Sequence, residues 1–415
     1  MNKTIVSLAN FLCNASQMSR DTSAEATVPS GDGRRQIGGR TTPGFTGVRQ
    51  AFEATLVHRT GAGAALCVIH NGRTAVDLWG GTDLHGRPFT ADTLQLVFSA
   101  TKGAAALCTA LLVERDQLDI HRPVAYYWPE FAQAGKQTLT VDHALSHRGG
   151  LAALDRRLSL DDVFDGEPVI ESLAAQRPLW KPGSAHGYHA VTYRFLVGKL
   201  VKRETGTPLS RYFAAEVREP LGLDFWIGLP PDLEPRVAPL IDGPPPGPAQ
   251  RLILHIARRR RSLLWRSLTL DGTLHSASTA ELFNQRRSHA AQMASATGIR
   301  ALAGMYAAAL GQAGGTPLLS PPVLETVTRP RAEGWDRCMF TRSRFALGFG
   351  LHSKMSPFTS QAAFGHYGIS GSFGFADPTL DLAIGYITSH IAPDATNDPR
   401  IRALRAALMK SATTT

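Results

Sequence analysis

The sequence predicts a mixed α/β protein in which an antiparallel sheet, flanked by helices, is interrupted by a large and mainly helical insertion. Residues 64–79 have the pattern of a β-hairpin, and the next strand-like segments appear only from residue 345 onward. The apolar runs between these two regions have the length and composition of helices. The chain has 415 residues, of which 43% are hydrophobic, enough to bury one large core or two packed parts.

The sheet begins with two apolar strands around Asn71-Gly72, a dipeptide that favours a two-residue hairpin turn. A helix-like segment at about 46–58 precedes this hairpin and is expected to pack on one face of the sheet. Further strands are expected at residues 345–352, 362–367, 372–376 and 380–388, followed by a closing helix at about 398–409.

Apolar helical runs at residues 103–114, 141–145, 190–205 and 299–310 fill the middle of the chain, separated by loops rich in Pro and Gly. The predicted organisation has three parts. Residues 1–44 form a flexible N-terminal segment, residues 45–95 and 315–415 form the sheet part, and residues 96–314 form the helical part.

The formal net charge of +10 is concentrated in a basic insertion at about 243–275, which contains Arg258, Arg259, Arg260 and Arg261 among leucines and isoleucines. One interpretation is a basic amphipathic helix in peripheral contact with an anionic membrane. The other is a solvated helix face or a mobile insertion. No nucleic-acid motif accompanies the arginines, so we expect no nucleic-acid partner.

The four cysteines are widely spaced, without a Cys-x-x-Cys pair or a Cys/His cluster of metal-ligand spacing, and are expected to be free thiols. No metal or organic cofactor is expected. The N-terminal apolar run is too short and interrupted to predict a signal peptide, and no segment predicts a transmembrane helix. We therefore expect a cytoplasmic protein or one peripherally associated with the cell envelope.

Ser99-Ala100-Thr101-Lys102 opens the apolar helical run. Residues three apart on a helix share a face, so the lysine amine can take the proton of the serine hydroxyl and make it a nucleophile. The unpaired amides at a helix start favour a serine alkoxide. The structural alternative is a helix-capping serine beside a solvated lysine.

Two further segments carry candidate site residues. Tyr188 lies where a loop with two glycines leads into a helical run, and a nearby lysine would lower the pKa of its phenol toward that of a general base. The segment 364–378 has Gly at every third position, including Gly368, and places His366 beside backbone amides that could bind an oxyanion. The alternatives are a core tyrosine and an ordinary Gly-rich hairpin.

In their order and spacing, these three elements resemble the penicillin-recognising serine hydrolases: class C β-lactamases, DD-peptidases and family VIII carboxylesterases. The resemblance spans about residues 44–409 and includes Leu145-Ser-His-Arg-Gly-Gly-Leu151. The segments around Tyr188, at 220–224 and at 374–378 are more similar to the esterase branch, including actinobacterial-type lipases. The resemblance implies a β-lactamase/transpeptidase-like fold.

Carried over residue by residue, the resemblance makes Ser99 the acylated nucleophile, Lys102 its proton partner and Tyr188 the base that serves the leaving group and the deacylating water. The amides of Ser99 and Ile369 would form the oxyanion hole. His366 takes the position of the lysine in the Lys-Thr-Gly motif of β-lactamases.

Two departures from the family pattern bear on the substrate. Ala190 replaces the asparagine of the Tyr-x-Asn motif, which in β-lactamases binds the acylamide side chain, and His366 replaces a permanent cation. Both favour a neutral small-molecule ester, so we predict a serine carboxylesterase or lipase-like hydrolase. The alternatives are a β-lactamase or D-Ala-D-Ala peptidase, and a catalytically silent binding protein that kept the fold. For the acyl group of an ester, Trp180, Phe225 and Trp226 are candidates to line an apolar pocket, and the alternative is that they are ordinary core aromatics.

Overall fold

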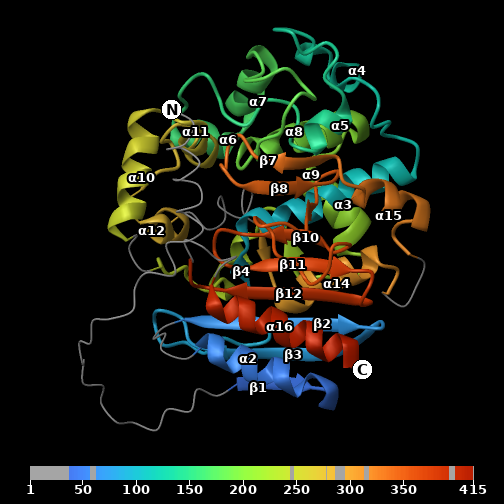
Figure 1. Cartoon of the computed structure of the whole chain (residues 1–415), viewed down its shortest axis with the longest axis vertical. Helices are drawn as coiled ribbons and strands as arrows, with labels where there is room; N and C mark the ends of the chain where they lie inside the picture. Colours follow the sequence, from blue (N-terminus) through green and yellow to red (C-terminus); the bar gives the residue numbers. More distant parts are fainter. Residues whose placement is uncertain are drawn as a thin grey trace.

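We analysed a computed structural model of the chain, which describes residues 37–56, 62–243, 247–276, 278–285, 295–312, 317–391 and 398–414. Its centre is a large sheet in which neighbouring strands pair antiparallel (Figure 1). In spatial order the described strands are β1 (Ile37–Thr41), β3 (Arg73–Gly81), β2 (Gly63–His70), β12 (Leu382–Thr388), β11 (Phe373–Asp377), β10 (Phe364–Tyr367), β9 (Gly350–Leu351), β8 (Arg342–Phe345) and β7 (Ala332–Trp335). The two ends of the chain therefore build one sheet.

The β2–β3 turn has the conformation that its sequence predicts. Asn71 and Gly72 have φ of 50° and 70°, so both central residues are left-handed, as a type I′ turn requires. Asn tolerates this region and Gly has no Cβ to oppose it. The predicted hairpin is therefore present.

Helices cover both faces of the sheet. On the outer face, α2 (Thr46–Leu56) and α16 (Pro399–Thr414) lie side by side, with Phe52 and Leu404 in the core beneath them (Figure 1). On the opposite face, α14 (Ile299–Ala309) packs against β12, β2 and β11. A Cβ built on Gly374 would lie 2.8 Å from Leu302, so Gly374 allows α14 to approach the sheet closely.

The insertion is mainly helical, and its central helix is α3 (Thr101–Glu114), in which every residue from Thr101 to Leu112 is buried. A helix that is buried on all sides forms the middle of a core. Other α-helices described in the insertion are α4 (Val124–Tyr127), α5 (Val141–Leu145), α6 (Leu160–Asp165), α7 (Glu167–Ala175), α8 (Thr192–Thr205), α9 (Leu209–Phe213), α10 (Pro248–Arg259), α11 (Leu263–Thr269) and α12 (Thr279–Asn284). After the insertion, α15 (Pro321–Thr328) precedes β7.

The expectation that strands return only near the C-terminus is wrong. A second sheet, in the order β4 (Gln95–Leu96), β6 (Ala296–Thr297) and β5 (Phe225–Trp226), lies within the helical region. Each of these strands has two residues, which is too short for an alternating hydrophobic pattern to appear in the sequence. This small sheet fixes the chain that leads into Ser99.

The expected flexible segment 1–44 also needs a correction at its end, because residues 37–41 form the edge strand β1, paired with β3. Its sequence, Ile-Gly-Gly-Arg-Thr, lacks hydrophobic alternation, and its residues are half-buried or exposed. Residues 42–44 are also described and lead into a 3-10 turn at Pro43–Phe45, whereas residues 1–36 lie outside the described residues. The domain boundaries remain a prediction, although α14, inside the range 96–314, packs on the sheet.

Within the described residues, no helix has both the length and the apolar content needed to cross a membrane.

Candidate active site

Ser99 lies in a single 3-10 turn, Phe98–Ala100, between β4 and α3. Phe98, immediately before it, has φ of 48°, a left-handed conformation that is uncommon for a bulky residue. Backbone strain of this kind persists only where the surrounding structure holds it, and it is concentrated at functional sites. Ser99 is partly exposed, whereas its helical neighbour Lys102 is 6% exposed.

The Lys102 amine joins two segments that are far apart in the sequence. Its Nζ is 3.1 Å from Ser99 Oγ and donates to the carbonyl oxygen of Ala190 at 2.7 Å. No acidic side chain forms an ion pair with Lys102 in the described part of the chain. Burial without a counter-ion lowers the pKa of Lys102 to about 7. A large fraction of this amine is therefore neutral near pH 7 and able to accept a proton.

Tyr188 lies over the same amine, with Lys102 Nζ 4.9 Å from the centre of its ring. The sequence predicts a lowered pKa for the Tyr188 phenol, and the structure gives the opposite direction. Burial raises the pKa of Tyr188, and a hydrogen bond with Ser99 only partly opposes this effect. The expected lowering by a lysine cation is wrong, because burial of the phenol dominates and Lys102, with a pKa of about 7, is only partly charged near pH 7. Tyr188 is therefore protonated in the free protein.

His366, on β10, also contacts Tyr188, with its Nε2 3.5 Å from the phenol oxygen. Its Nδ1 is 2.8 Å from the carbonyl oxygen of Tyr367, which can only accept, so Nδ1 carries the hydrogen. Burial, with a contribution from Lys102, lowers the pKa of His366 to about 3. His366 is thus neutral and presents an unprotonated Nε2 to Tyr188.

Gly368 brings the end of β10 against the chain that precedes Ser99. A Cβ at this position would lie 2.1 Å from the carbonyl oxygen of Val97, so only glycine fits. Its N–H donates to Ser372 O at 2.7 Å, which closes a tight turn containing Ile369. The Ile369 side chain is 50% exposed. The turn therefore lies beside Ser99, and its role as an oxyanion hole remains a prediction.

Asp336 supports Tyr188 and was not identified from the sequence. Its carboxylate accepts hydrogen bonds from the backbone N–H of Tyr188 at 3.0 Å, of Cys338 at 2.9 Å and of Met339 at 2.8 Å. The Ser343 hydroxyl donates to it at 3.0 Å. No motif surrounds Asp336, and its contact with Tyr188 spans 148 residues, so sequence spacing carries no signal for it.

His147 also packs against the site, and it belongs to the segment whose resemblance was noted in the sequence. Its ring centroid is 5.1 Å from that of Tyr188 and 4.4 Å from that of Phe345. Its Nδ1 accepts the backbone N–H of His189 at 3.1 Å. His147 therefore orients the chain between Tyr188 and Ala190.

Three aromatic residues were expected to line an acyl pocket, and the structure separates them. Phe225 is fully buried against Phe213, with ring centroids 5.0 Å apart, so its expected place in a pocket wall is wrong. Trp180 is 7% exposed and donates to Ala185 O at 3.0 Å. Trp226 lines a different cavity on the helical part.

The three cysteines in the described residues, Cys67, Cys108 and Cys338, are buried free thiols, as expected, and Cys13 lies outside those residues. No group of three or more His, Cys, Asp or Glu side chains suited to a metal ion occurs within the described part of the chain.

The comparison with known proteins identifies the family. The family model described as Beta-lactamase matches residues 48–408, which covers every strand of the large sheet except β1, the helical part and every candidate site residue. The chain belongs to the beta-lactamase family. The predicted family and its β-lactamase/transpeptidase-like α/β fold are therefore confirmed.

Relatives within the beta-lactamase family include esterases. The chain is 34% identical over 375 residues to "Esterase/beta-lactamase LipL" of Mycobacterium tuberculosis, covering 87% of this chain and 84% of that protein. A solved family VIII carboxylesterase is 32% identical with a TM-score of 0.80, covering 91% of this chain and 100% of the other. EstA from Arthrobacter nitroguajacolicus Rue61a is 31% identical with a TM-score of 0.77, covering 92% and 99%.

Proposed function

We propose that this beta-lactamase family protein is a serine carboxylesterase that cleaves small-molecule esters through an acyl-enzyme. The observation that carries the proposal is the hydroxyl of Ser99 3.1 Å from a buried lysine amine whose pKa is about 7. A general base is most effective when its pKa lies near the working pH. The solved family VIII carboxylesterase of similar fold and the relative named Esterase/beta-lactamase LipL support the ester as the substrate class.

In the acylation step, the neutral amine of Lys102 accepts the Ser99 proton while Ser99 Oγ attacks the ester carbonyl carbon. The carbonyl oxygen becomes an oxyanion, for which the backbone amides of Ser99 and Ile369 are the proposed donors. One such donor contributes about 3 kcal/mol to lowering the barrier.

Collapse of this intermediate breaks the bond to the alcohol oxygen. Tyr188, protonated because it is buried, donates its phenol proton to the departing alkoxide and recovers one from Lys102. The unprotonated Nε2 of His366 holds the phenol in place. Water then attacks the acyl carbon and gives a proton to the same pair. The bond from this carbon to Ser99 Oγ breaks, Oγ takes the proton back from the pair, and the acid is released.

The preference for esters over β-lactams rests on two positions. At the place of the β-lactamase lysine, His366 is neutral and offers no cation for a substrate carboxylate. At position 190 the side chain is a methyl group, and the backbone carbonyl is occupied by Lys102. A β-lactamase or D-Ala-D-Ala peptidase remains the second candidate. The name of the LipL relative includes beta-lactamase beside esterase, which supports the first of these two.

The test compares hydrolysis of p-nitrophenyl butyrate with that of nitrocefin by the same purified protein. We expect a larger kcat/KM for the ester, and Ser99→Ala should abolish its turnover. A much larger kcat/KM for nitrocefin would replace the esterase by a β-lactamase. Full ester hydrolysis by Ser99→Ala would show that Ser99 is not the nucleophile, and no hydrolysis of either substrate by the parent would favour the silent binding protein.

A finer proposal concerns anionic membranes. The peripheral helix α10 (Figure 1) exposes Leu252 and Leu254, at 59% and 40%, on a segment that also exposes Arg258, Arg259 and Arg260. Arg261 does not share this role, since it pairs with buried Asp271. Exposed leucines beside arginines suit the surface of an anionic bilayer, where the esters of long-chain acids partition.

Sedimentation with phosphatidylglycerol vesicles tests this contact, with phosphatidylcholine vesicles as the uncharged comparison. Changing Arg258, Arg259 and Arg260 to Gln should reduce binding to the anionic vesicles. The matched control changes Arg73, Arg87 and Arg329 to Gln, which removes the same charge from other exposed surfaces. Equal binding by the two triple variants would reject the proposal.

A further inference from the structure

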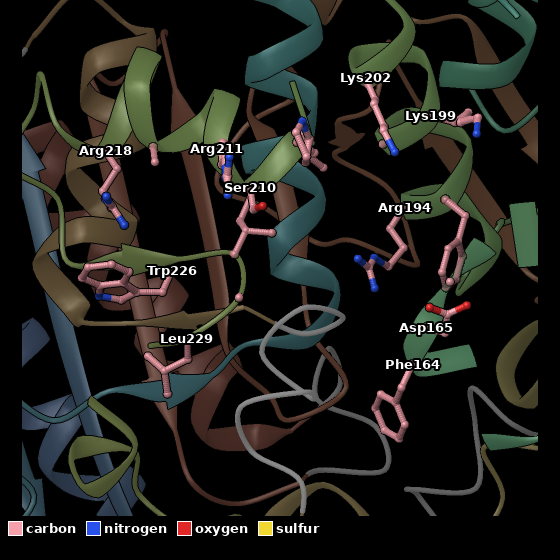
Figure 2. Close-up of a pocket in the computed structure, with 18 of the residues that line it drawn as sticks. Phe164, Asp165, Arg194, Lys199, Lys202, Ser210, Arg211, Arg218, Trp226 and Leu229 are labelled. Carbon is pink, nitrogen blue, oxygen red and sulfur yellow. The ribbon is translucent and has the colours of Figure 1, made fainter. Parts of the chain in front are cut away.

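A cavity of about 830 Å³ lies in the helical part, apart from the residues around Ser99. It is lined by α8 and α9, by the junction of α6 and α7, and by residues 226–231, which begin at the last residue of β5 (Figure 2). Ser99, Lys102, Tyr188 and His366 do not line it. Its volume is in the range of pockets that hold small organic ligands.

The lining of this cavity includes five basic and three acidic side chains, and two of the basic ones are paired. Lys199 is 2.8 Å from Glu167, and Arg218 is 2.6 Å from Glu219. Among the described residues, no acidic partner pairs with the other three, which are Arg194, Lys202 and Arg211. Asp165 also lines the cavity, but no ion pair joins it to any of them.

Arg194 is the central cation of the cavity. In Figure 2 its guanidinium points from α8 into the open space. The group is partly buried and lies 4.8 Å from the centre of the Phe195 ring. Burial lowers the pKa of Arg194 to about 10. A desolvated cation without a counter-ion is costly, and a bound anion would remove that cost.

Much of the remaining wall is apolar. Phe164 and Ile170 contribute from α6 and α7, Trp226 is the last residue of β5, and Ile227 and Leu229 follow it. Trp226 is held in position by Arg218, whose Cζ lies 4.1 Å from the centre of the indole. A ligand that occupies the whole cavity therefore needs an anionic end and an apolar body.

We propose that this cavity binds an anionic amphiphile, with an oxyanion headgroup on Arg194 and an apolar chain against Phe164 and Trp226. The planar guanidinium suits the paired oxygens of a carboxylate or a phosphate, and both headgroups share this chemistry. Lys202 and Arg211 add positive charge at the exposed rim. The site is independent of ester hydrolysis, because the reaction residues lie outside it.

Calorimetric titration of the full chain tests the site with four probes: dodecanoate, dodecyl phosphate, inorganic phosphate and dodecyltrimethylammonium. We expect both anionic amphiphiles to bind, the tighter one identifying the natural headgroup. Inorganic phosphate should bind more weakly, because it has no chain. The cationic amphiphile has the same chain and should not bind.

Arg194→Gln should weaken dodecanoate binding by at least about tenfold, as expected for the loss of a charge-assisted hydrogen bond. Arg203→Gln is the matched control, since Arg203 lies on the same helix but pairs with Glu130 outside the cavity. Arg211→Gln changes the exposed rim and should weaken binding about threefold by loss of charge. Arg211→Gln therefore tests the cavity even if Arg194→Gln does not fold.

Ser99→Ala separates this cavity from the reaction centre and should bind dodecanoate as the parent does. The proposal is overturned if no anionic amphiphile binds, if the cationic amphiphile binds equally well, or if Ser99→Ala loses binding while the cavity variants retain it.

Discussion

The side-chain amine of Lys102 lies between Ser99 and Ala190, 3.1 Å from the hydroxyl oxygen of the first and 2.7 Å from the carbonyl oxygen of the second. A carbonyl accepts hydrogen bonds and cannot supply a full countercharge. Ala190 therefore orients the amine without keeping it protonated, and the lone pair of the neutral amine is left for Ser99.

Replacing Lys102 should remove the base. We expect Lys102→Met to lower kcat for p-nitrophenyl butyrate by about 10³-fold, within the usual range for a general base. Lys102→Arg should be equally inactive, because a guanidinium stays protonated. In the parent, kcat/KM should rise as pH increases through about 7, where Lys102 loses its proton. If kcat/KM does not change with pH on either side of the Lys102 pKa of about 7, this assignment is contradicted.

The same lysine should make the stability of the protein depend on pH. Its pKa is about 7 in the folded state and about 10.4 in an unfolded chain, so the unfolded state binds more protons between these values. The free energy of unfolding should therefore rise with pH in this window, by up to about 1.4 kcal/mol per pH unit from this group. Denaturant titrations at several pH values should show this slope for the parent but not for Lys102→Met. The exposed Lys181→Met is the control and should keep it.

Tyr188→Phe should affect substrates according to their leaving groups. The variant cannot protonate the departing oxygen, which matters most for a strongly basic alkoxide. We expect a loss in kcat of about 10²-fold or more with ethyl butyrate and a clearly smaller loss in the acylation burst with p-nitrophenyl butyrate. Equal losses for both esters would show that Tyr188 does not serve the leaving group.

Gly368→Ala should displace the turn that contains Ile369, since the added methyl group would meet Val97 O at 2.1 Å. If this turn supplies an oxyanion donor, kcat should fall by about 10²-fold, while KM changes less. Gly47→Ala is a suitable control, because a Cβ at Gly47 on α2 meets nothing within 4 Å. Unchanged kcat in Gly368→Ala would remove the turn from the catalytic machinery.

Local sequence patterns predicted the longer elements well. The Asn71-Gly72 hairpin, the buried helix after Ser99 and the strands β10, β11 and β12 carry signals over several residues, and the structure contains each of them. The strand expected at residues 345–352 is instead the end of β8 and the separate short strand β9, and β7 was not predicted. The two-residue strands β4, β5 and β6 and the polar edge strand β1 were missed, because their pairing depends on distant partners rather than on their own composition.

The contacts of the candidate site likewise include some that local sequence predicts and others that join distant segments. Ser99 and Lys102 are one helical turn apart, so their proximity follows from the sequence. Asp336 reaches Tyr188 across 148 residues, and Ala190 acts through a backbone carbonyl that any residue would supply, so no side-chain pattern could indicate either contact.

The sequence by itself determined the candidate nucleophile, its lysine, the order of the three motifs and the family that they resemble. Only the tertiary structure decided the protonation of the site. A pKa depends on the balance between desolvation and neighbouring charges, and both are set by what packs around a group. Burial lowers the pKa of Lys102 to about 7 and keeps Tyr188 protonated, which reverses the expectation drawn from a lysine beside a tyrosine.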